Sequence, residues 1–297
     1  MIAMEKKIRS SALLPTALLS GLFVFIWATG FIVAGIVAPR ADPLTFLAIR
    51  HAFSIAVFGA LSLAVRAAWP RTPRAWRDAI VAGMLLHGVY LGGVFWSVSQ
   101  GLPSGMAALV TGLQPLLTAL LAAPLLHERL RSRQWTGIGI GLAGVGLIVA
   151  PRLGPVDGVP LAALAGAFVA TLSFSLGTIW QKYSRPQLDL RVNATIQYVG
   201  ALLLTLPVAA AFEDHRFDGS LALWGALGWA VLGLSVGAIS ILLVLLKRGA
   251  ASRVAPLLYL APPLAALMAW VLFAEPLTAV QLAGIVLAVA GAFVARH

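Results

Sequence analysis

The stretch Gln114-Pro-Leu-Leu-Thr-Ala-Leu-Leu-Ala-Ala-Pro-Leu-Leu-His-Glu-Arg-Leu130 has a second copy, Ala261-Pro-Pro-Leu-Ala-Ala-Leu-Met-Ala-Trp-Val-Leu-Phe-Ala-Glu-Pro-Leu277. A single offset of 147 residues, without a gap, aligns identical residues from Pro115 with Pro262 to Gly144 with Gly291. Because Glu and Gln are rare in this chain, their recurrence at the same offset argues against chance. The sequence therefore contains a tandem duplication, the signature of an architecture built from repeated units.

The same offset extends toward the N-terminus of each copy. Gly30 aligns with Gly177, and the aromatic Trp27 aligns with Phe174. We therefore predict two repeats, residues 13–150 and 160–295, which together cover nearly the whole chain.

The composition of the repeats is that of a membrane protein. Hydrophobic residues make up 60% of the 297 residues and charged residues 10%, whereas soluble proteins have about 45–50% and about 25%. A helix needs about 20 apolar residues to cross a bilayer. We predict an all-α integral membrane protein with ten transmembrane helices, at residues 13–37, 44–65, 79–99, 104–128, 135–149, 161–180, 192–212, 221–246, 255–273 and 279–294.

The basic residues gather in alternate joints between these helices. On the N-terminal side of the membrane the joints and tails hold 17 Lys and Arg residues, whereas the opposite side holds only Arg40, Arg152 and Arg216. Lys and Arg in short loops are retained in the cytoplasm, so both termini are expected there. The net charge of +11 is thereby explained without a nucleic-acid partner, and the partner that we expect instead is the lipid bilayer.

Five helices in each repeat place the second repeat in the opposite orientation to the first. The joint that contains Glu128 carries Arg129, Arg131 and Arg133, whereas its copy at 274–277 carries no basic residue. Inverted repeats of this kind build secondary transporters that alternate access around a site at the middle of the membrane. The alternative interpretation is that ten helices form a scaffold or an integral-membrane enzyme.

Several motifs also carry a family resemblance. They are Trp27-Ala-Thr-Gly-Phe-Ile-Val-Ala34, Pro43-Leu-Thr-Phe-Leu-Ala-Ile-Arg50, His127-Glu-Arg-Leu130, Ala274-Glu-Pro-Leu277 and the proline-led stretches after Gln114 and Ala261. The chain resembles the EamA-type permeases of the drug/metabolite transporter superfamily, and among them the bacterial amino-acid exporters, including those for aromatic amino acids. The resemblance implies an inner-membrane exporter of amino acids or similar small metabolites, or alternatively of drugs. Members of that family usually have Gly where this chain has His127 and Ala274.

Polar groups at membrane depth are the candidates for a site, because charge there is costly unless it is paired or used. All ten acidic residues lie in joints or at helix ends, and Arg50 is the strong base within a span. Its planar guanidinium suits a carboxylate, which an amino acid would supply. The alternative is a structural pair with Asp42 or with helix carbonyls.

The helix at 79–99 places His87 near the middle of the membrane with Tyr90 on the same face. This face is expected to line a polar cavity, although a buried His can also be hydrogen-bonded within a core. Without a carboxylate inside a span, we expect facilitated export or exchange rather than proton coupling, with His87 as the titrating group if there is one.

Prolines break two helices at matching positions. Pro115 frees the carbonyl of Thr111, next to Gln114, whereas Pro262 and Pro263 free carbonyls in the copy. Freed carbonyls at two matching positions indicate a central site and gating points, although neighbouring Ser or Thr could satisfy such kinks instead.

Three aromatic residues, Trp27, Trp96 and Tyr259, lie deep enough to stack on an apolar substrate. The predicted substrate-binding residues are Trp27, Arg50, His87, Tyr90, Thr111, Gln114 and Tyr259, and the predicted helix-break or gating residues are Pro115, Pro262 and Pro263. The chain has no Cys and no acidic cluster within a span, so we expect no metal, no cofactor and no catalytic residue. A membrane prenyl transferase would need acidic clusters for Mg²⁺, and a channel would need no inverted repeat.

The predicted helices at 135–149 and 279–294 carry small residues at a spacing of four, Gly137 and Gly141 in one and Gly284, Ala288 and Ala292 in the other. Such residues let helices approach closely. These two helices are expected to serve packing or contact between copies rather than the transport pathway, in a monomer or a homo-oligomer.

Overall fold

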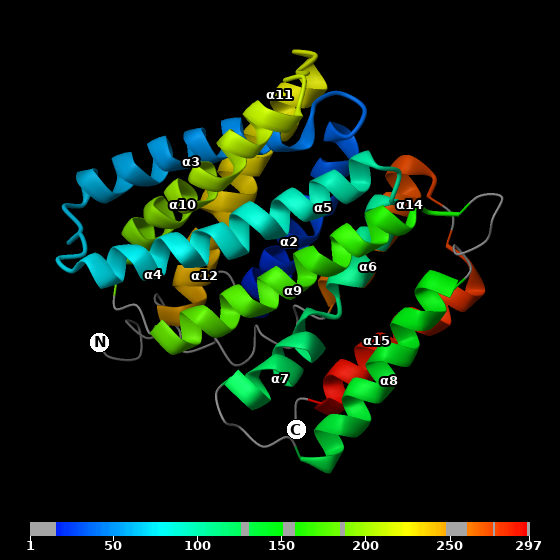
Figure 1. The fold of residues 1–297 in the computed structure, drawn as a ribbon. Coiled ribbons are helices and arrows are strands. Elements are labelled where there is room, and N and C mark those ends of the chain that lie inside the picture. Colours follow the sequence, from blue (N-terminus) through cyan, green and yellow to red (C-terminus); the bar gives the residue numbers. More distant parts are fainter. Residues whose placement is uncertain are drawn as a thin grey trace, which may run out of the picture.

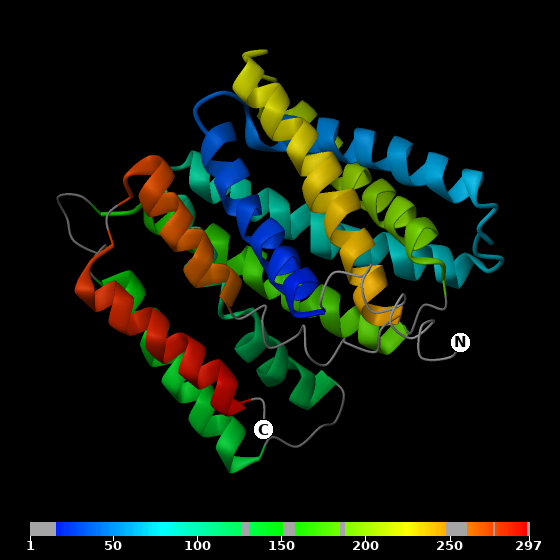
Figure 2. The same ribbon diagram turned by 180° about the vertical axis from the view of Figure 1, so that it is seen from behind.

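The computed structural model of this chain describes residues 16–125, 131–150, 158–184, 188–247, 260–275 and 277–295. Within those ranges the protein is a bundle of helices, and the only β feature is an isolated bridge between Ala41 and Phe217. Figures 1 and 2 show the bundle from opposite sides. The prediction of an all-α protein is confirmed for this part of the chain.

The first half contains α2 (Thr16–Val37), α3 (Pro43–Ala64), α4 (Pro73–Gly83), the π-helical segment η1 (Met84–Val89), α5 (Tyr90–Ser99), α6 (Ser104–Thr111), α7 (Gln114–Leu125) and α8 (Ser132–Val149). The second half contains α9 (Leu161–Ser184), α10 (Leu190–Phe212), α11 (Leu221–Gly228), the π-helical segment η3 (Trp229–Gly237), α12 (Ala238–Lys247), α14 (Ala261–Phe273) and α15 (Ala279–Ala295). Because α4, η1 and α5 are continuous, they form one long span, and α11, η3 and α12 form another.

Seven helices in the described ranges are long and apolar enough to cross a membrane, and they are Leu18–Val37, Pro43–Ala64, Pro73–Ser99, Ser104–Ala122, Leu161–Ser184, Leu190–Phe212 and Leu221–Ile241. Two shorter apolar helices, Ala261–Phe273 and Ala279–Gly291, follow. The predicted fourth helix is broken, because α6 ends at Thr111 and α7 begins at Gln114. The predicted third helix begins earlier than expected, at Pro73, where Thr72 accepts a hydrogen bond from the Ala75 backbone nitrogen as its N-cap.

Two carboxylates hold the starts of helices that lie far away in the sequence. Glu213, after α10, accepts hydrogen bonds from the backbone nitrogens of Leu44 and Thr45 at the start of α3, at 2.8 and 2.7 Å. Glu275, after α14, does the same for Ser104 and Gly105 at the start of α6. Helix N-termini carry unsatisfied N–H groups and partial positive charge, so both carboxylates stabilise the helices that they cap.

The residue before Glu275 is Ala274, which adopts the left-handed conformation with φ of 54°. This conformation favours glycine because it crowds a Cβ atom. The Gly that is usual in the family that this chain resembles would fit there without that crowding.

Helices α8 and α15 lie side by side as a pair at one edge of the bundle in both views (Figures 1 and 2). A Cβ atom added at Gly144 would overlap the backbone of Gly284 and Ala288, and one added at Gly291 would overlap the backbone of Gly137 and Gly141. The predicted close packing of these small residues is confirmed. Neither helix contributes to the central cavity described next.

Candidate functional site

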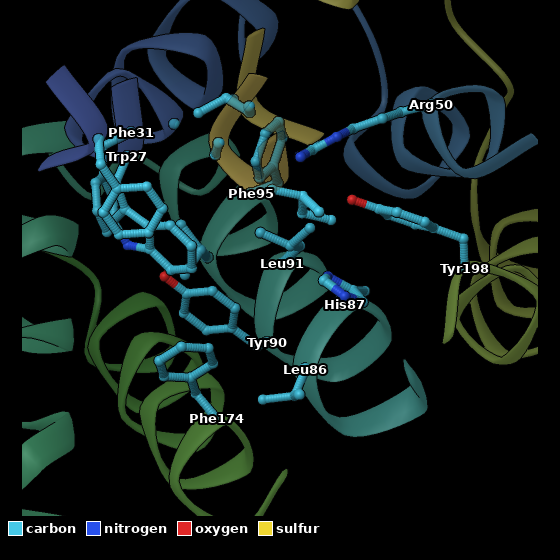
Figure 3. A pocket seen from close by; sticks show the side chains of 16 residues that line it. Trp27, Phe31, Arg50, Leu86, His87, Tyr90, Leu91, Phe95, Phe174 and Tyr198 are labelled. Carbon is cyan, nitrogen blue, oxygen red and sulfur yellow. The ribbon is translucent and has the colours of Figure 1, made fainter. Parts of the chain in front are cut away.

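The candidate site is a central cavity of about 130 Å³ enclosed by six segments: α2, α3, the η1–α5 span, α9, α10 and the η3–α12 span. Its walls are mainly apolar. Four of the residues that the sequence predicts for substrate binding line it: Trp27, Arg50, His87 and Tyr90. Figure 3 shows these side chains converging on the same space from different helices.

One wall of the cavity is aromatic. The ring of Phe174 on α9 lies 4.5 Å from the ring of Tyr90 and 6.2 Å from that of Trp27, measured between centroids. Because the repeat offset relates Trp27 to Phe174, each half supplies one ring from the same position. Rings at these separations form a surface on which a flat apolar group can stack.

Arg50 supplies the positive charge of the cavity. Its side chain is only 5% exposed, and its Nε atom has no hydrogen-bond partner among the described residues. The guanidinium extends from α3 toward the cavity, on the same side as the Tyr198 hydroxyl (Figure 3). The alternative prediction, a pair with Asp42, is not observed, because Asp42 instead binds Arg216. A buried cation that donates but cannot accept hydrogen bonds is suited to hold an anion.

Tyr198 is a lining residue that sequence reasoning missed. Its hydroxyl donates a hydrogen bond of 2.6 Å to Ser235 Oγ, which in turn donates to the Ala230 carbonyl within η3. The donor hydrogen of Tyr198 is thus used, and its oxygen remains able to accept. The repeat does not single out this residue, since its counterpart at the offset of 147 is His51, which does not line the cavity.

His87 lies in η1, with its ring stacked on that of Tyr198 at 4.7 Å between centroids. Its Nε2 atom lies 3.2 Å from Gln197 Oε1. Since an amide oxygen only accepts, Nε2 is the donor in this pair. His87 therefore lines the cavity, as predicted, and it is also hydrogen-bonded to Gln197 of α10, as the alternative prediction of a hydrogen-bonded buried His requires.

The other predicted residues lie elsewhere. Thr111 and Gln114 do not line the central cavity: Thr111 Oγ1 donates to the Ala108 carbonyl and Gln114 Nε2 donates to Thr118 Oγ1. Pro115 follows the break between α6 and α7. Tyr259 is outside the described residues.

The predicted break residues of the second half, Pro262 and Pro263, are near the N-terminus of α14, where both line a small cavity of about 20 Å³. That cavity also touches Gly112 at the break of the other half. The two predicted break points thus lie close together, and neither lines the central cavity.

The two π-helical segments occupy related positions in the two halves. Adding the repeat offset to the bounds of η1 gives residues 231–236, which lie within η3. Both segments line the cavity, η1 through His87 and η3 through Leu234. A π-helix is rare and often marks a functional site, so its presence in both halves draws attention to this cavity.

A larger cavity, about 710 Å³, lies on the other side of α2, among α11, η3 and α14. A hydrogen bond of 2.8 Å from Trp229 Nε1 to Thr29 Oγ1 crosses from η3 to α2 there. None of the residues predicted from the sequence for the substrate lines it. We therefore take the central cavity as the candidate site, in spite of its smaller volume.

Comparisons with known proteins agree with this architecture. The model of the EamA-like transporter family matches residues 14–150 and again residues 161–296. A "Probable amino-acid metabolite efflux pump" of Salmonella typhimurium is 28% identical over 289 residues, covering 92% of each chain. The "Uncharacterized inner membrane transporter YedA" of Escherichia coli K12 is 28% identical over 276 residues, covering 92% of this chain and 88% of the relative.

A solved crystal structure has the same fold, with a TM-score of 0.65 over 94% of this chain and 96% of its own, at 24% identity. The family model accounts for both halves, and the relatives are similar over nearly their full length. The chain therefore belongs to the EamA-like transporter family.

Proposed function

We propose that this protein is a secondary transporter of the inner membrane that exports amino acids or similar small metabolites by alternating access. The observation that carries the proposal is Arg50, a buried guanidinium with an unpartnered Nε that faces a cavity with an aromatic wall. Names of relatives support the direction and the membrane, since one is an efflux pump and another an inner membrane transporter.

An inverted repeat is part of the proposal. Two pairs of helices at the same position of the two halves pack on each other: α3 on α10, and α8 on α15. The contact of α5 with α9 has its counterpart in the contact of α12 with α2. This pattern is unchanged when the halves are exchanged, as a two-fold axis between them requires, and five helices in each half give the two halves opposite orientations.

The orientation of the protein in the membrane and its transport motion are also part of the proposal. The excess of Lys and Arg in alternate joints favours cytoplasmic termini, and export then runs from the side of those joints to the other. Two π-helical segments line the cavity at repeat-related positions, and the break between α6 and α7 meets the start of α14 at a separate small cavity. Local irregularities in helices are where bending concentrates, so we propose that these points flex as the cavity opens alternately to each side.

The size of the cavity favours small cargo. Its volume of about 130 Å³ is close to that of an engineered apolar cavity of about 150 Å³ that accepts benzene. Pockets for drug-sized ligands measure about 300–1,000 Å³. In the conformation described, the site fits one ring or one branched side chain with its carboxylate, which favours metabolites over large drugs.

A flux measurement with purified protein in liposomes tests the proposal. Counterflow of radiolabelled amino acids and related carboxylates is expected to be saturable. Arg50→Gln removes a charge-assisted hydrogen bond of about 1.5–3 kcal/mol and is expected to lower that flux about ten-fold or more. Normal flux in a folded Arg50→Gln protein would show that Arg50 is structural and that the cavity is not the cargo site.

A further inference from the structure

We propose that the preferred cargo is a small apolar or aromatic carboxylate with a net negative charge, rather than a zwitterionic amino acid, and that the membrane potential drives its export. This inference rests on the proposed function, because it concerns the chemistry of the same cavity. It derives from the charge that the cavity holds and from the groups that face it.

The charge of Arg50 has no fixed counter-charge near it. The acidic residues in the described ranges are engaged outside the cavity or exposed. Asp78, within α4, binds Arg77. At helix ends Asp42 binds Arg216, Asp189 binds Arg191, Glu213 caps α3 and Glu275 caps α6, while Asp214 and Asp218 lie exposed in the loop before α11. The sequence places the other three, Glu5, Glu128 and Asp157, in the N-terminal tail or in joints. The cavity therefore carries an unbalanced positive charge, which an anionic cargo neutralises.

Comparison of the two repeats shows why Arg50 lacks a counter-charge. Its counterpart at the repeat offset is Gln197, which is uncharged and is held by His87 at 3.2 Å. The counterpart of His87 is Leu234, which lines the cavity and has no polar group to offer Arg50. The pseudo-symmetric cavity is thus asymmetric in charge: His87 and Gln197 form a polar pair between the repeats, and Arg50 of the first repeat is a cation without a counter-charge.

An α-ammonium group finds no charged partner in the described part of the cavity. It has three N–H donors, and the lining side chains that can accept are all uncharged: the hydroxyls of Tyr90 and Tyr198, and His87 Nδ1, which accepts because Nε2 donates. Arg50 presents only donors, and no carboxylate is among the described lining residues. In addition, an ammonium one bond from the carbon that bears the carboxylate is repelled by the guanidinium that binds this carboxylate.

A net anion differs from a zwitterion in how it responds to voltage. Because cells are negative inside, an anion moves outward down the electrical gradient without a coupling ion, and about 59 mV supports a ten-fold concentration ratio for one charge. A zwitterion carries no net charge, so the membrane potential does not drive its export. Export of the anion thus needs no proton carrier, consistent with the absence of acidic residues from the described lining of the cavity.

The test uses two probes that share a ring and a carboxylate. L-3-phenyllactate carries a hydroxyl where L-phenylalanine carries the ammonium. With the purified protein in liposomes, and protein-free liposomes as the blank, we expect saturable phenyllactate uptake at least ten-fold faster than phenylalanine uptake at equal concentration. A potassium gradient with valinomycin sets the voltage. Phenyllactate uptake should rise when the interior is positive and fall when it is negative.

Three variants of the cavity sharpen the test. Arg50→Gln should abolish the preference, whereas Arg50→Lys keeps the charge and should retain the preference with weaker binding. Leu234→Glu places a carboxylate in the cavity with Arg50 and should lower phenyllactate uptake about ten-fold, whereas the isosteric Leu234→Gln should not. Arg71→Gln, in an exposed joint, is the matched control and should leave both fluxes unchanged.

The outcomes separate this inference from the function on which it rests. If phenylalanine is carried as fast as phenyllactate, and both fluxes depend on Arg50, the inference is overturned while the proposed function stands. The inference is also overturned if phenyllactate uptake does not depend on the voltage, or if Leu234→Glu and Leu234→Gln take up phenyllactate at the same rate. If neither these probes nor the other amino acids show a saturable flux, the proposed function itself is contradicted.

Discussion

The carboxylate of Glu275 accepts a hydrogen bond of 2.7 Å from the backbone nitrogen of Ser104, which lies 171 residues earlier in the chain. The Ser104 hydroxyl donates to the same oxygen at 2.8 Å, and the Gly105 nitrogen donates to the other oxygen at 2.8 Å. The loop of the second half is thereby fastened to the start of α6 in the first half. Glu213 makes the equivalent set of bonds to the start of α3.

Removal of this cap should destabilise the protein measurably. Glu275→Ala leaves the N–H groups of Ser104 and Gly105 without their charged acceptor, and bonds to charged groups contribute about 1.5–3 kcal/mol. We expect Glu275→Ala to have a lower thermal unfolding midpoint in detergent than the unchanged protein, and Glu275→Gln to have a midpoint between the two. Asp214→Ala, at an exposed position of the other loop, is the control and should leave the midpoint unchanged. An unchanged midpoint in Glu275→Ala would mean that water replaces the carboxylate there.

The glycines between α8 and α15 should tolerate no side chain. A Cβ atom at Gly144 would overlap the backbone of Gly284, whereas one at Gly146, on the same helix, would meet nothing within 4 Å. Gly144→Ala is expected to destabilise by about 1–3 kcal/mol, as overpacking does, and Gly146→Ala to be neutral. Thermal unfolding of the two variants compares them directly, and equal stability would show that the helices are not in close contact.

The aromatic wall should select for cargo with a ring. Trp27→Ala and Phe174→Ala each remove one of the two repeat-related rings, and an aromatic pair contributes about 0.5–1.5 kcal/mol beyond area burial. We expect the affinity for ring-bearing cargo to fall about two- to ten-fold, with little change for small aliphatic cargo. Competition assays in liposomes measure both. A similar loss for both classes of cargo would place the rings in helix packing rather than in recognition.

The two sides of the membrane can be assigned by thiol labelling, because the natural chain has no cysteine. Single cysteines replace Ser132, at the start of α8, and Asp214, between α10 and α11, both of which are exposed. An impermeant thiol reagent applied to intact cells is expected to label only position 214. Labelling of position 132 from outside would contradict the inverted orientation of the second half.

The sequence was a good guide wherever one local property decides the structure. Composition and length predicted the apolar helices, seven of which in the described ranges are long enough to cross a membrane. The spacing of small residues predicted that α8 and α15 serve close packing. Polar or aromatic groups at membrane depth were selected as candidates, because burying them there is costly unless they bind something. Four of them, Arg50, His87, Tyr90 and Trp27, line one cavity.

Features that depend on tertiary packing were harder to predict. Thr111 and Gln114 are polar and flank a broken helix, but both bond within their own chain segment instead of reaching the cavity. The sequences of η1 and η3 contain no local pattern from which their π-helical turns could be predicted. Tyr198 was overlooked because its role depends on Ser235 and His87, which come from other helices.

The central claim is that cargo occupies the cavity among Trp27, Arg50 and Phe174. A single cysteine at Leu234, which also lines the cavity, tests it through the rate of labelling by a small neutral maleimide, with cysteine at Ser132 as the control. We predict that transported cargo slows labelling at position 234, with half-maximal protection at the concentration that half-saturates transport, and leaves position 132 unaffected. An unchanged labelling rate at position 234 under saturating, transported cargo would contradict the claim.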